Sequence, residues 1–427
     1  MNNKIENSEQ KIMIFVMGMQ MIPKYSGKYE VWNNPGKDYI KHDPEKMTDK
    51  GLRDIASVYY PSIGLYDVTD PDYQEYAMQC LKMCYVDIVN YYIESDVDIA
   101  SNKTAWGVNF EQLVIPMLKK YGFAGAARIA MPIRCVDADG RIDKTFNAIL
   151  EKFGDNIATI NGRPMLPQFS IHNMNPETVK MWKQSWAEAH NGIEPFFMTP
   201  QTGYQLVTVD WPSVADGQFG WIELDERKPI NEYAENVGDY GKYADLETAK
   251  LNHDLMVERA KRYKENGKVT FYAESVTPAF DDVAVWAWNL GYPPRKIEGG
   301  ENGELYEYKW QSVLKNEPPM VTIPTWDDWG EGTAIEPALE YGIKRLEITR
   351  KYAAAYKGIE PNTASLELPG WIYKIRKTTD SKDILDDMQK ASDLIANGNF
   401  NEAEAIVKPY VNMLQIPQSS TELFEKI

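Results

Sequence analysis

Short apolar runs recur along the chain, and stretches with helical spacing of apolar positions lie between them. Eight runs have the near-continuous apolar character of strands buried on both faces of a parallel sheet: residues 11–22, 86–92, 124–133, 163–171, 193–200, 218–224, 268–276 and 319–326. Helical patterns cover residues 71–84, 109–121, 144–153, 176–190, 245–265, 306–315 and 338–356. Asp70 and Asn175, each followed by a proline, are suited to cap two of these helices. Residues 201–217 show no clear helical pattern.

This alternation predicts an α/β fold, namely a (β/α)8 TIM barrel over residues 11–357. A doubly wound open sheet is the second choice, but no Gly-rich phosphate loop follows the first strand. Residues 1–10 form a polar N-terminal leader. Residues 358–427 are expected to form a linker and a small C-terminal helical hairpin, in which Gly398 separates amphipathic stretches at 384–396 and 401–411. We expect this hairpin to pack on the barrel as a cap, with partner binding as the alternative.

Charge and composition narrow the class of ligand. The chain of 427 residues carries a net charge of −17, which repels nucleic acid and anionic membrane surfaces and suits neutral ligands. Its 26 tyrosines and 12 tryptophans include side chains able to stack on sugar rings. No apolar run reaches the ~20 residues of a membrane span. We therefore expect a monomer that binds an oligosaccharide or polysaccharide.

Metal and redox chemistry are not indicated. The three cysteines, Cys80, Cys84 and Cys135, lack His or acidic neighbours at metal spacing, and the four histidines are scattered singly. No metal and no cofactor are therefore expected. The compartment is unknown, and an extracytoplasmic location, periplasmic or at the cell surface, is expected only if an export signal preceded Met1.

The densest chemistry lies in residues 326–337, directly after the last predicted strand. This segment contains Trp326, Asp327, Asp328, Trp329, Glu331 and Glu336. Carboxyl groups crowded among aromatic rings have perturbed pKa values, and paired acids beside aromatic faces are what a sugar-cleaving site requires. A solvated acidic loop with two tryptophans at its rim is the alternative.

Other predicted strand ends carry further candidates. Because the carboxyl ends of barrel strands meet at one rim, we expect the side chains there to converge. Candidates for substrate binding are Tyr92, Glu94, Trp221, Glu223, Asp281, Asp282, Trp326, Trp329 and Glu336.

Three motifs resemble those of glycoside hydrolase family 99, the endo-acting α-mannosidases and α-mannanases. Residues 54–67 (DIASVYYPSIGLYD), which include Tyr66, followed by Asp70-Pro71, resemble an early motif of that family. Residues 278–282 (PAFDD) are similar to its Pro-Gly-Tyr-Asp-Asp segment. Residues 326–337 are similar to its Asn-Glu-Trp-His-Glu-Gly-Thr-x-Ile-Glu-Pro signature. A related group linked to polysaccharide biosynthesis shares the last motif with Gly in place of His. The motifs span roughly residues 30–357 in family order.

The resemblance implies a TIM barrel and a retaining mechanism. In that mechanism one Glu helps the substrate 2-hydroxyl attack the anomeric carbon, and a second Glu acts as general acid and then base. Carried onto this chain, the first role falls on Asp328, where Asp replaces the family Glu, and the second on Glu331. Asp327 and Gly330 replace the family Asn and His. An Asp carboxyl is retracted by roughly 1 Å relative to Glu, and a misplacement of that size can cost ~100-fold in rate.

These observations favour a glycoside hydrolase that acts on α-linked glycans, with α-mannosides as the expected class and with retention through the carboxylate pair. Two alternatives stay open. One is a non-catalytic carbohydrate-binding protein on a decayed hydrolase barrel, which the change from Glu to Asp at position 328 favours. The other is a sugar-transfer protein of polysaccharide biosynthesis, which Gly330 favours. Tyr66 and the strand-end residues would bind substrate in the first two cases.

Overall fold

The structure is a computed structural model of the chain. It describes residues 4–5, 10–34, 42–93, 99, 101–104, 107–129, 143–168, 176–201, 214–222, 241–285, 295–297 and 302–421.

Within the described residues, eight parallel strands form the barrel, and all eight predicted strands are among them. They are β2 (Lys11–Val16), β3 (Ile88–Ile93), β4 (Ala124–Ile129), β6 (Arg163–Pro167), β7 (Phe196–Gln201), β8 (Gly217–Gly220), β10 (Phe271–Ser275) and β12 (Met320–Ile323). Hydrogen bonds join them in the order β6-β7-β8-β10-β12-β2-β3-β4. The last strand, β12, thus pairs with the first, β2, which confirms the barrel and makes the doubly wound alternative wrong.

The remaining seam lies between β4 and β6, which are in contact. Gly125 of β4 forms a parallel bridge with Ile157, and its carbonyl accepts a hydrogen bond of 2.7 Å from the backbone N–H of Ala158. Ala158 in turn accepts one from Met165 of β6. The short strands β1 (Lys4–Ile5) and β5 (Thr159–Ile160) extend this edge, while β9 (Gly241–Ala244) and β11 (Arg295–Ile297) form a separate ribbon.

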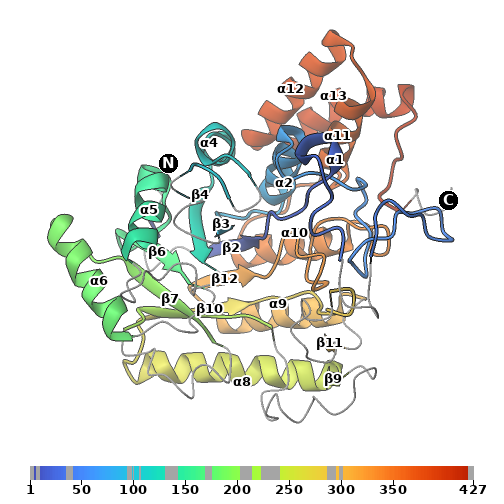
Figure 1. The fold of residues 1–427 in the computed structure, drawn as a ribbon. Helices are drawn as coiled ribbons and strands as arrows, with labels where there is room; N and C mark the ends of the chain where they lie inside the picture. Colours follow the sequence, from blue (N-terminus) through green and yellow to red (C-terminus); the bar gives the residue numbers. More distant parts are fainter. Residues whose placement is uncertain are drawn as a thin grey trace.

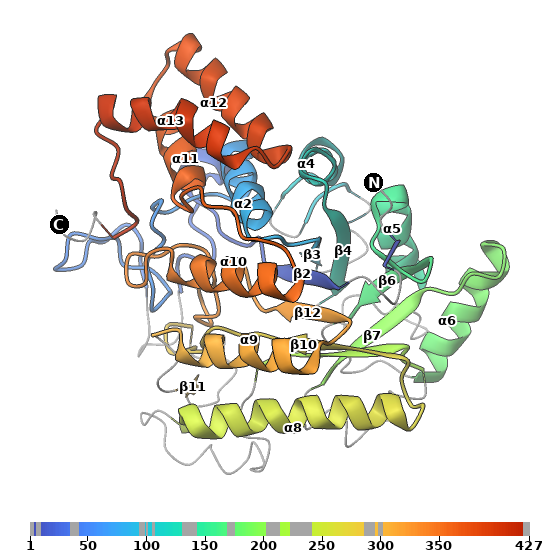
Figure 2. The same cartoon turned by 180° about the vertical axis from the view of Figure 1, so that it is seen from behind.

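The helices lie outside the sheet, as Figures 1 and 2 show. They are α1 (Pro23–Ser26), α2 (Pro71–Met83), the π-helical turn η1 (Phe110–Val114) leading into α4 (Ile115–Tyr121), α5 (Asp143–Phe153), η3 (Gly154–Asn156), α6 (Pro176–Ala189), α8 (Leu246–Glu265), α9 (Glu304–Asn316) and α10 (Lys344–Tyr356). The predicted cap at Asp70 is confirmed, because its Oδ1 accepts a hydrogen bond of 3.1 Å from the N–H of Asp72. The other predicted cap, Asn175, lies outside the described residues, as does most of 201–217.

One predicted helix boundary is wrong. Residues 338–343 were expected to begin a helix, but α10 begins at Lys344. The preceding residues pair with the early motif instead: the N–H of Ser62 donates to the carbonyl of Pro337, and the N–H of Leu339 donates to that of Tyr60. Tertiary hydrogen bonds have here replaced the first helical turn, which the sequence pattern alone does not reveal.

Alternation along the strands decides which side chains face the barrel interior. One hydrophobic cluster fills that interior, with Phe15, Ile88, Ala126, Met198, Phe219, Trp221, Ala273 and Met320 among its members. A larger cluster joins the outer faces of the strands to the helices and includes Tyr91. Since successive residues of a strand point to opposite faces, Tyr92 points inward and Glu274 points outward.

Three helices follow the barrel: α11 (Leu368–Thr378), α12 (Lys382–Ala396) and α13 (Phe400–Met413). The last two are the predicted hairpin, whereas α11 was not anticipated and falls in the segment expected to be a linker. α11 packs on α2, and in both views the three helices gather beside α2 (Figures 1 and 2). The division at 357/358 stays a prediction. Among the described helices, none is both long and apolar enough to cross a membrane.

An ionic cluster joins these helices to the barrel. Arg376 of α11 forms an ion pair of 2.5 Å with Glu75 of α2, and Lys120 of α4 bonds the other oxygen of Glu75 at 2.7 Å. Burial raises the pKa of Glu75, but the charges and hydrogen bonds of Arg376 and Lys120 outweigh it, and the net shift is downward. Since the Arg376 and Glu75 side chains are only 10% and 6% exposed, removing one partner would cost more free energy of unfolding than breaking a surface pair would.

Candidate functional site

The loop after β12 turns back across the barrel mouth and is held from below by the turn after β2. Asp327 is fully buried, and its two carboxyl oxygens accept hydrogen bonds from the N–H groups of Met17 (2.7 Å) and Gly18 (2.9 Å). Gln20 Nε2 donates to the Asp327 carbonyl at 2.8 Å. Burial raises the pKa of Asp327 to about 6, although these N–H groups and the Arg128 charge oppose the shift. Asp327 therefore fixes the loop as well as adding charge.

Asp328 and Glu331 lie one turn apart in the same loop. Asp328 is 2% exposed and Glu331 is half-buried. The N–H of Glu331 donates to Asp328 Oδ1 at 3.1 Å, and the N–H of Asp328 donates to Thr325 Oγ1 at 2.9 Å. Burial and then the negative charge of Glu331 raise the pKa of Asp328 well above its usual range. The two carboxyl groups are thus electrostatic neighbours at the carboxyl end of β12.

A buried cation faces this acidic loop. Arg128, on β4, is 1% exposed and donates from Nη1 to the carbonyls of Asn90 (3.1 Å) and Val16 (3.4 Å). Burial lowers the pKa of Arg128 to about 10, against the opposing influence of Tyr92, Asp327, Asp328 and Glu331. Arg128 was not among the site residues predicted from the sequence.

The two tryptophans of the loop lie inside the protein. Trp326 and Trp329 are 0% and 1% exposed. Trp326 Nε1 donates to the Tyr73 hydroxyl at 3.2 Å, and Trp329 Nε1 donates to the Tyr66 hydroxyl at 2.8 Å. Neither indole offers an open face, which favours a supporting role for both over direct stacking on a sugar.

Glu336 and Tyr66, two further candidates, complete this buried arrangement. Glu336 Oε2 accepts hydrogen bonds from the hydroxyls of Tyr66 (2.7 Å) and Tyr73 (3.4 Å), whose rings stack with centroids 3.7 Å apart. Burial raises the pKa of Glu336 well above its usual range, and the Asp327 charge adds to the shift. Both residues are at most 1% exposed, so the structure places them behind the acidic loop.

Two aromatic candidates do reach the barrel interior near the acids. The Arg128 guanidinium lies over the rings of Tyr92 (5.7 Å) and Trp221 (5.9 Å). Trp221 also packs edge-on against Phe15, with centroids 5.0 Å apart. Tyr92 and Trp221 are 6% and 7% exposed. The structure therefore brings both to the same end of the barrel as Asp327, Asp328 and Glu331.

Asp281 and Asp282 follow β10 and flank the loop. The N–H of Asp281 donates to the Glu331 carbonyl at 2.9 Å, and its carboxyl lies 3.6 Å from Lys296 Nζ. Gly332 makes this approach possible, since its φ is +66° and a Cβ there would lie 3.2 Å from the Asp281 backbone. Asp282 is fully buried against Arg295, with Nε to Oδ2 at 2.7 Å. Burial raises the pKa of both carboxyls despite these cations.

The two remaining candidates, Glu94 and Glu223, lie outside the described residues, as does Cys135. Cys80 and Cys84 are buried free thiols. Within the described parts of the chain, no group of His, Cys, Asp and Glu side chains could hold a metal ion.

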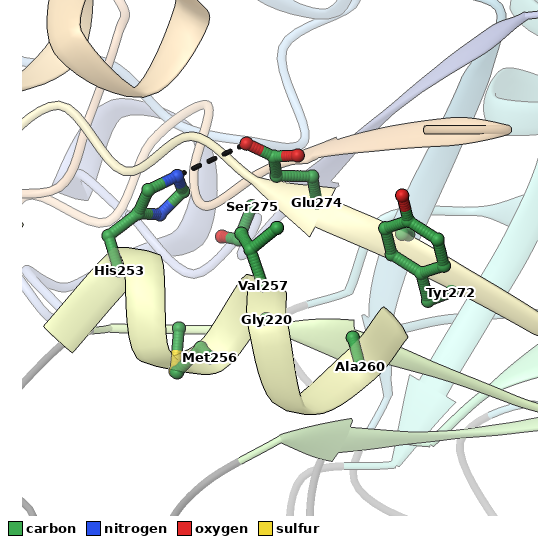
Figure 3. Close-up of a pocket in the computed structure, with 9 residues that line it drawn as sticks. Gly220, His253, Met256, Val257, Ala260, Tyr272, Glu274 and Ser275 are labelled. Atoms are coloured by element: carbon green, nitrogen blue, oxygen red, sulfur yellow. Dashed lines mark hydrogen bonds and ion pairs between the residues drawn. The ribbon is translucent and has the colours of Figure 1, made fainter. Parts of the chain in front are cut away.

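Glu274, also near a strand end, belongs to a different place. Figure 3 shows it reaching toward His253 of α8, on the outer face of the sheet. Its Oε1 lies 3.2 Å from His253 Nε2, and Asn316 donates to Oε2 at 3.2 Å. The cavity beside this pair is about 10 Å³, room for about one water molecule and none for a sugar. The pair therefore ties α8 and α9 to β10 and is not part of the acidic loop.

Comparison with solved structures supports the architecture. The endo-α-mannosidase of glycoside hydrolase family 99 from Bacteroides thetaiotaomicron superposes with a TM-score of 0.59 at 16% identity, over 81% of this chain and 97% of that one. A structure described as a glycoside hydrolase-like protein superposes with a TM-score of 0.51 at 14% identity, over 81% and 94% of the two chains. The likeness to these two structures shows the TIM-barrel fold.

Sequence comparison points the same way. The chain is 24% identical to the glycoprotein endo-α-1,2-mannosidase of Rattus norvegicus over 359 residues, which cover 78% of this chain and 72% of the relative. The protein of the same name from Xenopus laevis is 24% identical over 78% and 74% of the two chains. Residues 136–349, half of the chain, match the family model described as Glycosyltransferase WbsX. The chain belongs to this family and is similar to family 99.

Proposed function

We propose that this protein is a glycoside hydrolase that cleaves α-mannosyl glycans with retention, using Glu331 as general acid and base and Asp328 as its partner carboxyl. The observation that carries the proposal is the pairing of these residues at the carboxyl end of β12, where the Glu331 N–H bonds Asp328 Oδ1. Barrel enzymes place their chemistry at this end. The names of the relatives supply the α-mannosyl substrate class.

Burial gives the pair the property that glycoside cleavage needs. Because Asp328 is only 2% exposed and stands beside the Glu331 carboxyl, the two groups resist ionising together. Two carboxyls that interact in this way titrate as a pair, and one of them releases its proton at a higher pH than an isolated carboxyl does. A retaining site uses one protonated and one ionised carboxyl in its first step.

The first step then runs as follows. Glu331 gives its proton to the glycosidic oxygen as the bond from that oxygen to the anomeric carbon breaks. Asp328 takes the proton of the substrate 2-hydroxyl while the oxygen of that hydroxyl forms a bond to the anomeric carbon. If Asp328 does not reach the 2-hydroxyl, its own oxygen forms the bond, as in ordinary double displacement. In the second step Glu331 takes a proton from the water that attacks the anomeric carbon. The bond from that carbon to the 2-oxygen breaks and Asp328 returns its proton to the 2-oxygen; in double displacement the bond to Asp328 breaks instead and leaves its carboxylate. Each step inverts the anomeric carbon, so the net outcome is retention.

Tyr92 and Trp221 are the side chains best placed to bind the sugar. Their rings line the barrel end that the acids share, next to the Arg128 guanidinium. Asp281 stands on the other side, bonded through its N–H to the Glu331 carbonyl. Trp326, Trp329, Tyr66 and Glu336 support the loop from behind, since each is at most 1% exposed.

A second candidate function is transfer of a mannosyl group to another sugar, which the name of the matched family favours. A third, binding without turnover, is favoured by Asp328 standing where family 99 has Glu. The three functions share one ligand class and differ in products. One experiment therefore separates them.

The experiment offers the purified chain α-1,2-, α-1,3- and α-1,6-linked manno-oligosaccharides, with and without a nucleoside-diphosphate mannose. Products are followed by NMR, which reports the anomeric configuration at first release, and binding by calorimetry. Release of α-configured reducing sugar from the oligosaccharide alone supports the proposal. Chain extension that needs the nucleotide sugar supports transfer, and binding without product supports the third candidate. Release of β-configured sugar would overturn the retaining assignment.

A further inference from the structure

Arg128 lies in a setting unlike that of any other residue in the acidic site. It projects from β4 into the barrel interior, where its guanidinium lies over the rings of Phe15 (4.8 Å), Tyr92 and Trp221. Nη1 bonds two backbone carbonyls, at Val16 and Asn90, and Nη2 contacts the sulfur of Met17. Such contacts fix the direction of the guanidinium, since aromatic faces and carbonyl oxygens both attract a cation.

The turn after β2 that binds Arg128 also binds the carboxyl of Asp327. Arg128 bonds the carbonyl of Val16, while the N–H groups of Met17 and Gly18 bond the carboxyl of Asp327. Residues 16–18 therefore lie between the buried cation and the buried anion. A displacement of Arg128 would reach Asp327 through this turn and then Asp328, its neighbour in the chain.

Arg128 also faces the acids through space. Among the described residues, the ionisable groups whose charges act on it are Tyr92, Asp327, Asp328 and Glu331. Without a cation, desolvation and mutual repulsion would further disfavour ionisation of these buried and half-buried carboxyls. A guanidinium keeps its charge when buried, so it can serve as a permanent counterion where a Lys would tend to lose its proton.

We propose that Arg128 is a positioning residue for the proposed cleavage reaction: its fixed positive charge keeps the Asp327–Asp328–Glu331 cluster partly ionised, and its bonds hold the turn on which Asp327 rests. This inference rests on the proposed function and deepens it. A role in binding an anionic sugar fits less well, because the three carboxyls around Arg128 would repel such a ligand. The Arg128 guanidinium therefore compensates the negative charges of the protein's own carboxyls.

The first test is the pH dependence of kcat/KM for α-manno-oligosaccharide cleavage in wild type, Arg128→Met and Arg128→Lys. Removing the charge in Arg128→Met should raise the pKa values of the cluster and move the acidic limb upward by about 1 pH unit. A buried Lys tends to lose its proton, so Arg128→Lys restores the charge only in part, and its limb should lie between those of wild type and Arg128→Met. An unshifted limb in Arg128→Met would overturn the inference, whatever the loss of rate.

Arg345 supplies a matched control. It is also 1% exposed, lies over the rings of Tyr59 (4.8 Å) and Tyr341 (4.0 Å), and donates to the carbonyls of Gly332 and Ala334. Among the described residues, no hydrogen bond or ion pair joins Arg345 to a carboxyl of the cluster, and its Nε and Nη2 have no hydrogen-bond partner. Arg345→Met should therefore reduce stability without moving the acidic limb, which separates loss of a buried arginine from loss of this charge.

A second test does not depend on turnover. Carboxyls whose pKa is higher in the folded than in the unfolded chain weaken the fold as pH rises from the unfolded pKa, ~4, toward the folded one. Arg128→Met should raise the folded values further, so its loss of stability against urea should widen between pH 4 and pH 8. A deficit that is constant with pH would contradict the inference even if no substrate is cleaved. Absence of cleavage by wild type, with a widening deficit, would contradict the proposed function alone.

Discussion

The indole Nε1 of Trp329 donates a hydrogen bond of 2.8 Å to the hydroxyl of Tyr66, a residue 263 positions earlier in the chain. The Tyr66 hydroxyl in turn donates a hydrogen bond to Glu336 Oε2. The Tyr73 hydroxyl likewise accepts a hydrogen bond from Trp326 Nε1 and donates one to the same oxygen. One buried carboxyl thus fixes both tryptophans that flank Asp327 and Asp328. The early motif (residues 54–67) and the late motif (residues 326–337) therefore meet in one buried hydrogen-bond network.

Tyr66→Phe should therefore destabilise the fold more than it impairs substrate binding. The change leaves Trp329 Nε1 and Glu336 Oε2 each short of a partner in a fully buried place, at a cost of about 1–3 kcal/mol in the free energy of unfolding. Tyr91→Phe is the matched control, because the buried Tyr91 hydroxyl has no hydrogen-bond partner among the described residues. Urea unfolding of both variants measures the difference. Equal free energies of unfolding for the two variants would show that the Trp329–Tyr66–Glu336 hydrogen bonds add nothing to stability.

Glu336→Gln should gain stability relative to wild type as pH rises. Since burial raises the pKa of Glu336 well above its usual range, the folded protein holds a proton there that the unfolded chain, with a pKa of ~4.3, has released. Wild type therefore loses stability above pH ~4, and a neutral Gln does not. Urea unfolding at pH 4.5 and pH 8 gives the comparison. A stability difference that is the same at both pH values would contradict this assignment.

Glu331→Gln should abolish cleavage and leave affinity within about tenfold of wild type, because it removes a proton donor and little shape. Product release is measured beside calorimetric binding of the same oligosaccharide. Glu258→Gln, which alters an exposed carboxyl on α8 outside the acidic loop, serves as the comparison and should retain turnover. Normal turnover in Glu331→Gln would place the acid elsewhere.

Asp328→Glu should slow the reaction. Asp328 is 2% exposed and its Oδ1 already caps the N–H of Glu331, so an added methylene has to displace packed neighbours, typically at ~1–3 kcal/mol. Asp328→Asn keeps this hydrogen-bond acceptor and volume but cannot take a proton, and it should lose cleavage with little change in Tm. Faster cleavage of α-mannosides by Asp328→Glu would contradict this expectation. It would indicate that the shorter Asp side chain at position 328 limits the rate of the wild-type protein.

Arg376→Met should loosen the C-terminal helices from the barrel. It leaves Glu75 with Lys120 as its remaining cation, so we expect a loss of roughly 2–3 kcal/mol in the free energy of unfolding, below the 3–5 of a fully orphaned buried charge. The pKa of Glu75 lies below its usual value, so the stability it contributes is present above the unfolded pKa of ~4.3 and is lost as pH falls through the folded one. The deficit of Arg376→Met should accordingly shrink at pH 3. The double variant with Glu75→Gln should recover part of the loss.

The strands and most helices could be predicted because their signal is local. A strand buried on both faces must be apolar throughout, and β2, β10 and β12 stand out for that reason. The start of α10 could not be predicted in this way. It depends on hydrogen bonds that join residues 337–339 to Tyr60 and Ser62, which lie far away in the chain. Pattern alone does not contain such pairings.

The candidate site divides in the same way. The acids of residues 326–337 are conspicuous because charge in such a position, after an apolar strand, is uncommon. Arg128 escaped notice because one cation inside an Ala-rich strand gains meaning only when β4 is placed beside β3 and β2. The burial of Trp326 and Trp329 was equally hidden, because it arises from tyrosines of α2 and the early motif.

The ion pair between Glu75 and Arg376 has a consequence for synthesis of the chain. The two residues are 301 positions apart, so at ~5–20 residues per second α2 leaves the ribosome roughly 15–60 s before its partner is made. During that interval Glu75 and the aromatic face of α2 have no α11 to cover them. A nascent chain stalled before residue 376 therefore exposes the face of α2 that α11 covers in the folded protein.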